Sequence, residues 1–423
     1  PITLTVATSS PSPPTLSEEE FMEGTRDWLN NLKIRGSWGL LGNQSALSDY
    51  YPWLNTYKLD GKYIIGDVLN TGYWQESYKL ASISWEKART WGIGVDASLF
   101  SHVDLSVDYY DRKTTDIIMD VPVPQEFGLS AYKDNIGEMV NRGVEVTLSY
   151  HNQWGDWSFG ATGNFAYNKN ELLDLGGVSA MVDPNDEYKR RQVGERLNSY
   201  YAYKAVGFFN SDEEAQAWMD KYAGQDGYPF SGTFKGGDLI YADTNGDGKM
   251  TEADRVVLGS SDPSWTFGLN LNAGYKGFDL SLMFTGAAGV SRMLDNNAVG
   301  DFTGDVQHPA SVWLDAWTPE NKDAKMPRID YGTDSPSRAW NNLSSFWIQN
   351  ANYLRLKNLQ FGYTFPKKWL KALHVENLRM YYSAENVFTI DNMLVNVDPE
   401  STDRGGYSYP LLRTHSFGVS LTF

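Results

Sequence analysis

The clearest pattern in this chain is a strict alternation of apolar and polar positions over its last seven residues. Phe417, Val419, Leu421 and Phe423 are apolar, and glycine or a small polar residue separates each pair. Successive side chains of a β-strand point to opposite faces, so this period of two predicts a strand with one apolar face. We interpret the four apolar residues as a C-terminal signal for assembly of a transmembrane β-barrel, with the last aromatic at the membrane interface. The alternative is a terminal strand docked in a soluble sandwich.

The same alternation recurs along the chain in segments of about 8–11 residues, the length that a tilted strand needs to cross a bilayer. The clearest segments are 143–150, 157–167, 266–275, 278–284 and 378–385, and weaker ones lie at 32–40, 91–100, 102–112 and 198–207. In the segment 353–365 the phase of the pattern slips near Asn358. A β-bulge at that point would keep the apolar residues on one face.

The connections between these segments alternate in length. The short connections are 100–102, 151–156, 275–277 and 366–375. The long connections are 41–90, 113–141, 169–197, 208–262, 286–349 and 391–410. Outer-membrane barrels have short periplasmic turns and long external loops, so the alternation predicts an antiparallel transmembrane β-barrel. The segment 198–207 fits this scheme only if it stays within an external loop.

Composition agrees with an all-β membrane protein. The 423 residues include 39 glycines, 14% are aromatic, and no run of 18 apolar residues that could form a membrane-spanning helix occurs. A net charge of -17 excludes nucleic acid as a partner, because no basic excess is available to neutralise phosphates. The chain has no cysteine, so neither a disulfide framework nor a thiolate metal site is expected.

Two local signals lie outside the strands. Ser211 and Glu214 form the pattern of a capping box, which predicts a helix from residue 211 to residue 219 inside the long connection 208–262. Residues 1–16 are rich in serine, threonine and proline, and we expect a disordered or foreign leader there. Residues 17–423 are then the partial barrel with its external loops.

The connection 208–262 contains the one motif with metal-ligand spacing. Oxygen ligands fall at positions 1, 3, 5, 7, 9 and 12 of a calcium-binding loop, namely Asp243, Asn245, Asp247, the backbone carbonyl of Lys249, Thr251 and Asp254. Gly248 occupies position 6, where such a loop turns most sharply. The motif predicts a structural Ca²⁺ as the cofactor. The alternative is an Asx-rich turn without an ion.

Candidate catalytic residues are weak by comparison. The five histidines stand in no metal-binding or nucleophile motif, and the many acidic residues follow no catalytic spacing. A pair of loop carboxylates could act as in a glycosidase, but solvation of the surface explains them better. We therefore predict that the chain is not an enzyme.

Several stretches resemble the C-terminal barrel region of the SusC/RagA family of TonB-dependent outer-membrane transporters from Bacteroidetes. These stretches occur in family order at 32–39, 42–44, 135–137, 141–145, 237–241, 317–321, 345–347, 353–359 and 362–363. The resemblance implies the C-terminal part of a 22-stranded barrel in the outer membrane of a Gram-negative bacterium. It also implies an N-terminal plug, a TonB complex that supplies energy, and a SusD-like lipoprotein that captures a glycan or sometimes a peptide.

The chain departs from the family pattern in two respects. The plug, the TonB-contacting segment and the first strands are not among its residues, and our count of roughly ten to twelve strands is about half a barrel. Residues 1–16 also differ from the strand expected before residue 17. We therefore expect residues 1–423 to be the C-terminal piece of a longer importer.

Three functions remain open from the sequence. The first is the barrel portion of a TonB-dependent importer of glycans or other oligomeric nutrients. The second is a passive porin-like channel, which would conduct without an energy source. The third is a surface protein that binds or cleaves glycans through loop aromatics and carboxylates.

Overall fold

The computed structural model describes most of the chain. The described residues are 4–5, 17, 19–45, 47, 51–75, 78–121, 123–183, 186–300, 309–330, 335–338, 341–371, 374–402 and 408–423. They form two compact units, of which the first comprises residues 1–146 and 167–197 and the second residues 147–166 and 198–423.

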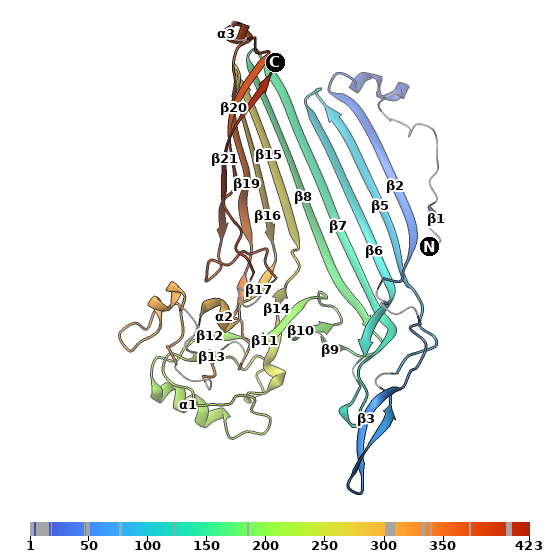
Figure 1. Cartoon of the computed structure of the whole chain (residues 1–423), viewed down its shortest axis with the longest axis vertical. Helices are drawn as coiled ribbons and strands as arrows, with labels where there is room; N and C mark the ends of the chain where they lie inside the picture. The colour runs from blue at the N-terminus through green and yellow to red at the C-terminus, as the bar shows by residue number, and fades with distance from the viewer. Residues whose placement is uncertain are drawn as a thin grey trace. The chain divides into compact units, whose positions relative to one another are not determined.

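The main element is an antiparallel sheet of eleven strands, which confirms the predicted all-β fold class (Figure 1). Its order is β1-β2-β5-β6-β7-β8-β15-β16-β19-β20-β21, so nearly all neighbours in the sheet are consecutive long strands of the chain. The strands are β1 Leu4–Thr5, β2 Leu29–Asn43, β5 Glu86–Leu99, β6 Val103–Val121, β7 Tyr132–Trp154, β8 Trp157–Leu175, β15 Trp265–Tyr275, β16 Phe278–Ala288, β19 Tyr353–Thr364, β20 Asn377–Asp391 and β21 Thr414–Thr422.

The remaining elements lie in the connections between these strands. Short strands form small sheets of their own: β3 Lys58–Ile65, β4 Val68–Trp74, β9 Ala180–Asp183, β10 Asp186–Gln192, β11 Ser199–Tyr203, β12 Ala205–Phe208, β13 Leu239–Tyr241, β14 Arg255–Ser260, β17 Ser291–Met293 and β18 Ile348–Asn350. The helices are η2 Glu20–Thr25, η3 Gln125–Phe127, α1 Asp212–Tyr222, η4 Glu252–Asp254, α2 Asn296–Val299, η5 Ser311–Asp315 and α3 Lys367–Leu370. Among the described residues, no helix combines the length and the apolar character needed to cross a membrane.

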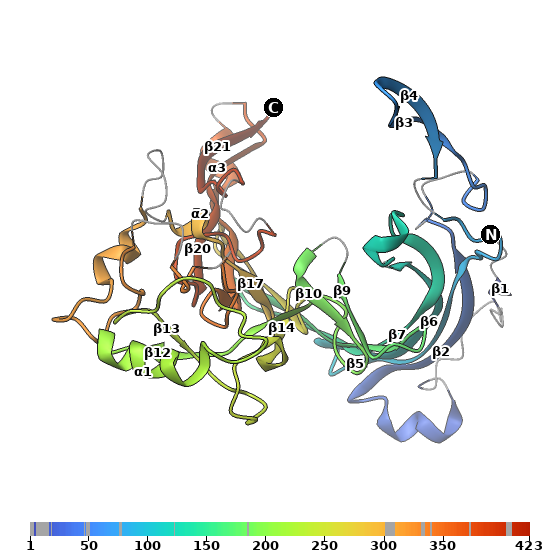
Figure 2. The same ribbon diagram turned by 90° about the horizontal axis from the view of Figure 1, so that it is seen from below.

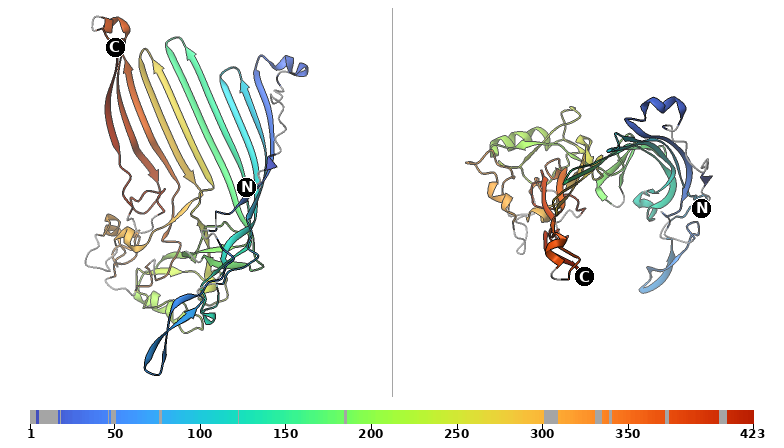
Figure 3. Two further views of the ribbon diagram at one scale, coloured as in Figure 1. Left: turned by 45° about the vertical axis from the view of Figure 1, so that its right-hand side comes forward. Right: turned by 90° about the horizontal axis from the view of Figure 1, so that it is seen from above.

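In the first unit, β2 pairs with β5 along almost its whole length, and β5 pairs with residues 103–115 of β6. The predicted loop 113–141 is much too long, because β6 continues to Val121 and β7 begins at Tyr132. Polar side chains dominate both strand ends, so alternation of apolar residues does not mark them. The connection from β2 to β5 carries the hairpin β3–β4, which extends past the ends of those two strands (Figure 3).

In the second unit, the predicted bulge is confirmed. Met283 pairs with Asn358 and Phe284 pairs with Leu356, so Lys357 is the extra residue. The segment 198–207 is confirmed to lie outside the main sheet, because β11 pairs with β14 and β12 pairs with β13. Helix α1 lies beside the β12–β13 pair (Figure 2).

The helix prediction needs one correction. Ser211 caps α1, and its hydroxyl accepts a hydrogen bond from the Glu214 amide. The Glu214 carboxylate, however, accepts from the amide of Asn210 at 2.6 Å, one residue before the cap. The helix also continues to Tyr222.

Most of the leader prediction for residues 1–16 falls outside the described residues. Of that segment the structure describes only Leu4 and Thr5, which pair antiparallel with Leu40 and Gly39 of β2.

Candidate functional site

The main sheet has one apolar and one polar face within each unit. In the second unit, Leu271 pairs with Leu282 on the apolar face, and the next pair along, Asn272 and Ser281, lies on the polar face. An ion pair joins Arg379 to Asp279 across strands on that polar side.

The first unit has the same division. Ile34 pairs with Val95 on the apolar face, where Ile34 is 53% exposed. On the polar face Arg35 forms ion pairs with Asp96 at 2.7 Å and with Asp108 at 2.9 Å. Exposed aliphatic side chains on a long sheet face are unfavourable in water, whereas lipid would cover them at no cost. The two faces therefore suit a wall between lipid and an aqueous lumen.

In the second unit, the register places Phe417, Val419 and Leu421 of β21 opposite Tyr382, Met380 and Leu378, on the apolar face of the sheet. Phe417, Val419, Leu421 and Phe423 are 85%, 57%, 50% and 82% exposed, respectively. The Phe417 ring lies 5.1 Å from the ring of Tyr382 on β20. The structure thus places the four residues together, and their role as an assembly signal stays a prediction.

The connection between β8 and β15 has a hydrophobic core of its own. We call residues 198–262 the loop module. Its buried core consists of Tyr203, Phe209, Ala215, Tyr222, Phe230, Phe234, Leu239, Tyr241 and Met250. Full burial of a large apolar side chain contributes about 1.5–3 kcal/mol, so this core stabilises the folded module. The module is a folded platform beside the strand ends of the second unit.

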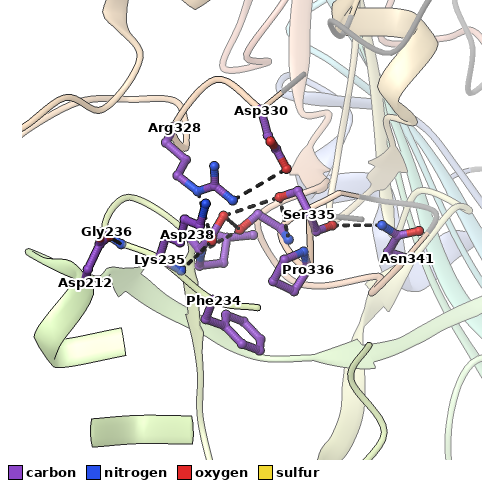
Figure 4. A network of polar contacts seen from close by, with 12 residues as sticks. Asp212, Phe234, Lys235, Gly236, Asp238, Arg328, Asp330, Ser335, Pro336 and Asn341 are labelled. Carbon is purple, nitrogen blue, oxygen red and sulfur yellow. Dashed lines mark hydrogen bonds and ion pairs between the residues drawn. The ribbon is translucent and has the colours of Figure 1, made fainter. Parts of the chain in front are cut away.

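A buried carboxylate fastens this module to two distant segments of the second unit (Figure 4). Asp238, which is 0% exposed, accepts hydrogen bonds from the Lys235 amide at 2.8 Å and from the Arg328 guanidinium at 3.0 Å. Its other oxygen accepts from the hydroxyls of Ser335 at 3.3 Å and Ser337 at 2.9 Å. Four donors therefore converge on one carboxylate.

The protonation of Asp238 reflects two opposed effects. Burial raises the pKa of its carboxyl group, because the charged form loses its hydration. The Arg328 charge and the hydrogen bonds lower this pKa, and burial is the larger effect. No sequence motif for catalysis or metal binding contains Asp238, and its Ser335 and Ser337 partners follow it by almost a hundred residues. The local signals were the turn-forming pair Gly236–Gly237 directly before it and the stretch 237–241, which resembles the family.

The predicted metal loop is a tightly turned segment. Asp243 accepts hydrogen bonds from the amides of Gly246 at 2.7 Å and Gly248 at 2.9 Å. Both glycines have positive φ, +73° and +77°, which a glycine adopts without strain. Asp247 accepts from the Lys249 amide at 2.8 Å, and the Asn245 amide group donates to Asp247 at 3.3 Å.

Asp254 takes a different role from the predicted one within this geometry. It is 0% exposed, and its two oxygens accept from the amides of Thr244 at 2.9 Å and Thr251 at 2.8 Å. Together with Thr251 it forms the capping box of η4. Within the described part of the chain, no three His, Cys, Asp or Glu side chains are gathered closely enough to hold a metal ion. Ligation of a cation by Asp254 would require its side chain to leave the capping box. The Ca²⁺ site stays a prediction.

Comparison with known proteins relates the chain to one family. The family model described as "TonB dependent receptor-like, beta-barrel" matches residues 24–287, more than half of the chain. TonB-dependent receptor P26 of Formosa agariphila is 30% identical over 96% of this chain and 41% of the relative. TonB-dependent receptor SusC of Bacteroides thetaiotaomicron is 26% identical over 96% of the chain and 39% of the relative. The chain thus spans about two fifths of the length of these relatives.

A solved structure has the same fold. The structure described as that of the RagAB peptide transporter superposes with a TM-score of 0.75 at 24% sequence identity. The match covers 97% of this chain and 42% of the solved one.

Proposed function

The chain belongs to the TonB-dependent receptor-like β-barrel family, in its SusC/RagA branch in the outer membrane of Gram-negative bacteria, and from this premise we propose that it is the barrel portion of an importer. The cargo is a glycan or another oligomeric nutrient, which passes along the polar face of the sheet. A SusD-like lipoprotein covers the external loops, and a TonB complex supplies energy through the N-terminal part of the intact receptor. No covalent chemistry is part of this function.

The observation that carries the proposal is the division of the long sheet into an apolar and a polar face. Ion pairs such as Arg35–Asp96 hold charge on the side where a solute would pass. The folded loop module supports the proposed partner, because a rigid external platform costs less entropy to bind than a mobile loop does.

Two further roles belong to this proposal. We place Ca²⁺ in the loop 243–254, held by Asp243, Asn245, Asp247, Thr251 and the Lys249 carbonyl, with Asp254 as a ligand only after it leaves its capping box. The ion would pin the turn at the surface of the loop module. The apolar residues of β21 serve as the assembly signal and meet lipid.

The test uses the intact receptor that contains this chain, together with its lipoprotein partner, in living cells. Uptake of a labelled nutrient should fall to the background of a receptor-deletion strain when TonB is removed. Equal uptake with and without TonB would contradict the proposal and would favour the passive channel. Hydrolysis of a glycan by the purified receptor would favour the third candidate, a glycan-cleaving surface protein.

A further inference from the structure

The second unit contains a cavity of about 800 Å³ at the ends of β19 and β20. Arg355 of β19 and Thr389 and Asp391 of β20 line it from the sheet. The connection between β20 and β21 closes it with Asp398 and Glu400, among other residues. Sites for small ligands have volumes of about 300–1,000 Å³, so this cavity has the size of a binding site.

The register of the strands places the cavity on the polar face of the sheet. Arg355 pairs with Thr389, so the two side chains point to the same side. The neighbouring pairs, Leu354 with Ile390 and Leu356 with Phe388, point to the opposite, apolar side. A solute moving along the polar face would therefore pass this cavity without meeting lipid.

One buried arginine fixes the wall of the cavity. The side chain of Arg355 is 3% exposed, and its guanidinium binds Asp398 at 2.6 Å and Glu400 at 2.8 Å. Its Nε donates to the Thr389 hydroxyl at 2.9 Å, and the Tyr353 hydroxyl donates to Glu400. Both ion pairs of this buried guanidinium reach the connection between β20 and β21, so they hold that connection against the sheet. The cavity is preformed, which reduces the entropy lost on binding.

The lining offers donors and acceptors next to each other. Asp391 accepts one hydrogen bond from the Met393 amide, and a carboxylate can accept about four. Arg413 donates from Nε to the Asn386 carbonyl at 3.4 Å, and a guanidinium carries five N–H donors. Neighbouring hydroxyl groups of a sugar both donate and accept, so they match such a lining.

Two properties narrow the class of ligand. Tyr409 lines the cavity and is 82% exposed, so its ring offers a flat apolar surface for a sugar ring. Among the described residues, three carboxylates against two guanidinium groups give the lining an excess of one negative charge. This excess disfavours phosphorylated or acidic ligands.

From these contacts we propose that the cavity is a binding subsite for neutral sugar rings of an oligosaccharide. Asp391 and Arg413 hydrogen-bond the hydroxyl groups, Tyr409 covers one ring face, and the Arg355 cluster positions the wall. The subsite rests on the proposed function, because it assumes that a nutrient crosses the polar face.

The experiment measures binding to the intact purified receptor by isothermal titration calorimetry. The probes are maltohexaose, laminarihexaose, xylohexaose and an inulin-type fructan, with a pool of neutral hexapeptides as the competing class. The variants Tyr409→Ala and Asp391→Asn remove the ring surface and one acceptor. Tyr73→Ala, at a tyrosine of the β3–β4 hairpin that is 74% exposed and does not line the cavity, is the matched control.

At least one oligosaccharide should bind, and its affinity should fall about tenfold or more in each cavity variant and stay unchanged in the control. Absence of binding by all four oligosaccharides, or equal binding by the cavity variants, would overturn the subsite. Hexapeptide binding that Tyr409→Ala weakens would overturn the sugar assignment. TonB-dependent uptake that continues in any of these cases shows that only the subsite has failed, and not the importer function.

Discussion

Replacing Asp238 by alanine tests how the loop module is held in place. The change removes an acceptor that serves four donors, of which the Arg328 guanidinium carries charge. Breaking a buried charge pair costs about 3–5 kcal/mol, because the remaining charge is left without a partner. Since about 1.4 kcal/mol corresponds to a factor of ten, local opening of the module should become roughly a hundredfold to a few thousandfold more frequent.

Hydrogen exchange of the intact receptor measures this opening directly. The amide of Leu239 is a suitable probe, because it is buried and donates to the Ser337 hydroxyl at 2.8 Å. The matched control is Asp212→Ala, which removes the hydrogen bond that the Gly236 amide donates at 2.8 Å. One such bond is worth about 0.5–1.5 kcal/mol, so the control should raise exchange only about twofold to tenfold. An Asp238→Ala effect no larger than that of the control would refute the view that this carboxylate fastens the module.

Three further predictions concern pH, calcium and the membrane. Burial raises the folded-state pKa of Asp238, so its contribution to module stability is greatest below the ordinary pKa of about 3.9 and falls as pH rises from there through the raised folded-state pKa. The exchange rate of the wild type relative to Asp238→Asn should rise over that pH window. A flat ratio would contradict the raised pKa of Asp238. Chelation by EGTA, or the double substitution Asp243→Ala and Asp247→Ala, should speed proteolysis of residues 208–262 several-fold while the main strands stay protected. Digestion patterns identical to those of the untreated wild type would exclude a structural ion. Val419→Lys on the apolar face of β21 should destabilise the assembled barrel by about 2–4 kcal/mol and reduce the heat-modifiable folded form. Ser416→Lys on the polar face, opposite Ser383, should leave that form nearly unchanged. Equal effects of both would contradict the facing of β21.

The parts of the fold that the sequence predicts are those where one local rule decides the outcome. Strands that alternate strictly, such as β15 and β21, lie where the pattern places them. The bulge at Lys357 follows from a phase slip of one residue, because a strand that keeps its apolar face must add a residue there.

The parts that were missed depend on contacts between distant segments or on strands without apolar alternation. The start of β7, from Tyr132, mixes polar and apolar residues on both faces and therefore gives no period-two signal. The hairpin β3–β4 is apolar on both faces, because Ile64 and Ile65 are both exposed although they point to opposite faces. It therefore shows no alternation of apolar and polar residues either. The partners of Asp238 come from segments about ninety or more residues later, which no local pattern can predict.

The candidate site was predictable only in part. The loop motif correctly located a tight turn with positive φ at Gly248, since that position of the motif demands it. The capping role of Asp254 was not predicted, because a carboxylate at position 12 of the motif and one in a capping box have the same sequence signature. The cavity beside Arg355 was also missed, since its ion-pair partners Asp398 and Glu400 follow that arginine by more than forty residues.

The measurement that tests the central claim most directly is a cysteine scan of β15 in the intact receptor. The chain contains no cysteine, so each introduced thiol in it reports on one position. In outer membranes, a water-soluble maleimide should label Asn270→Cys and Asn272→Cys on the polar face. It should leave Leu269→Cys and Leu271→Cys on the apolar face unlabelled until detergent is added. Equal labelling of all four positions would mean that both faces of the sheet meet water, and the barrel account would be wrong.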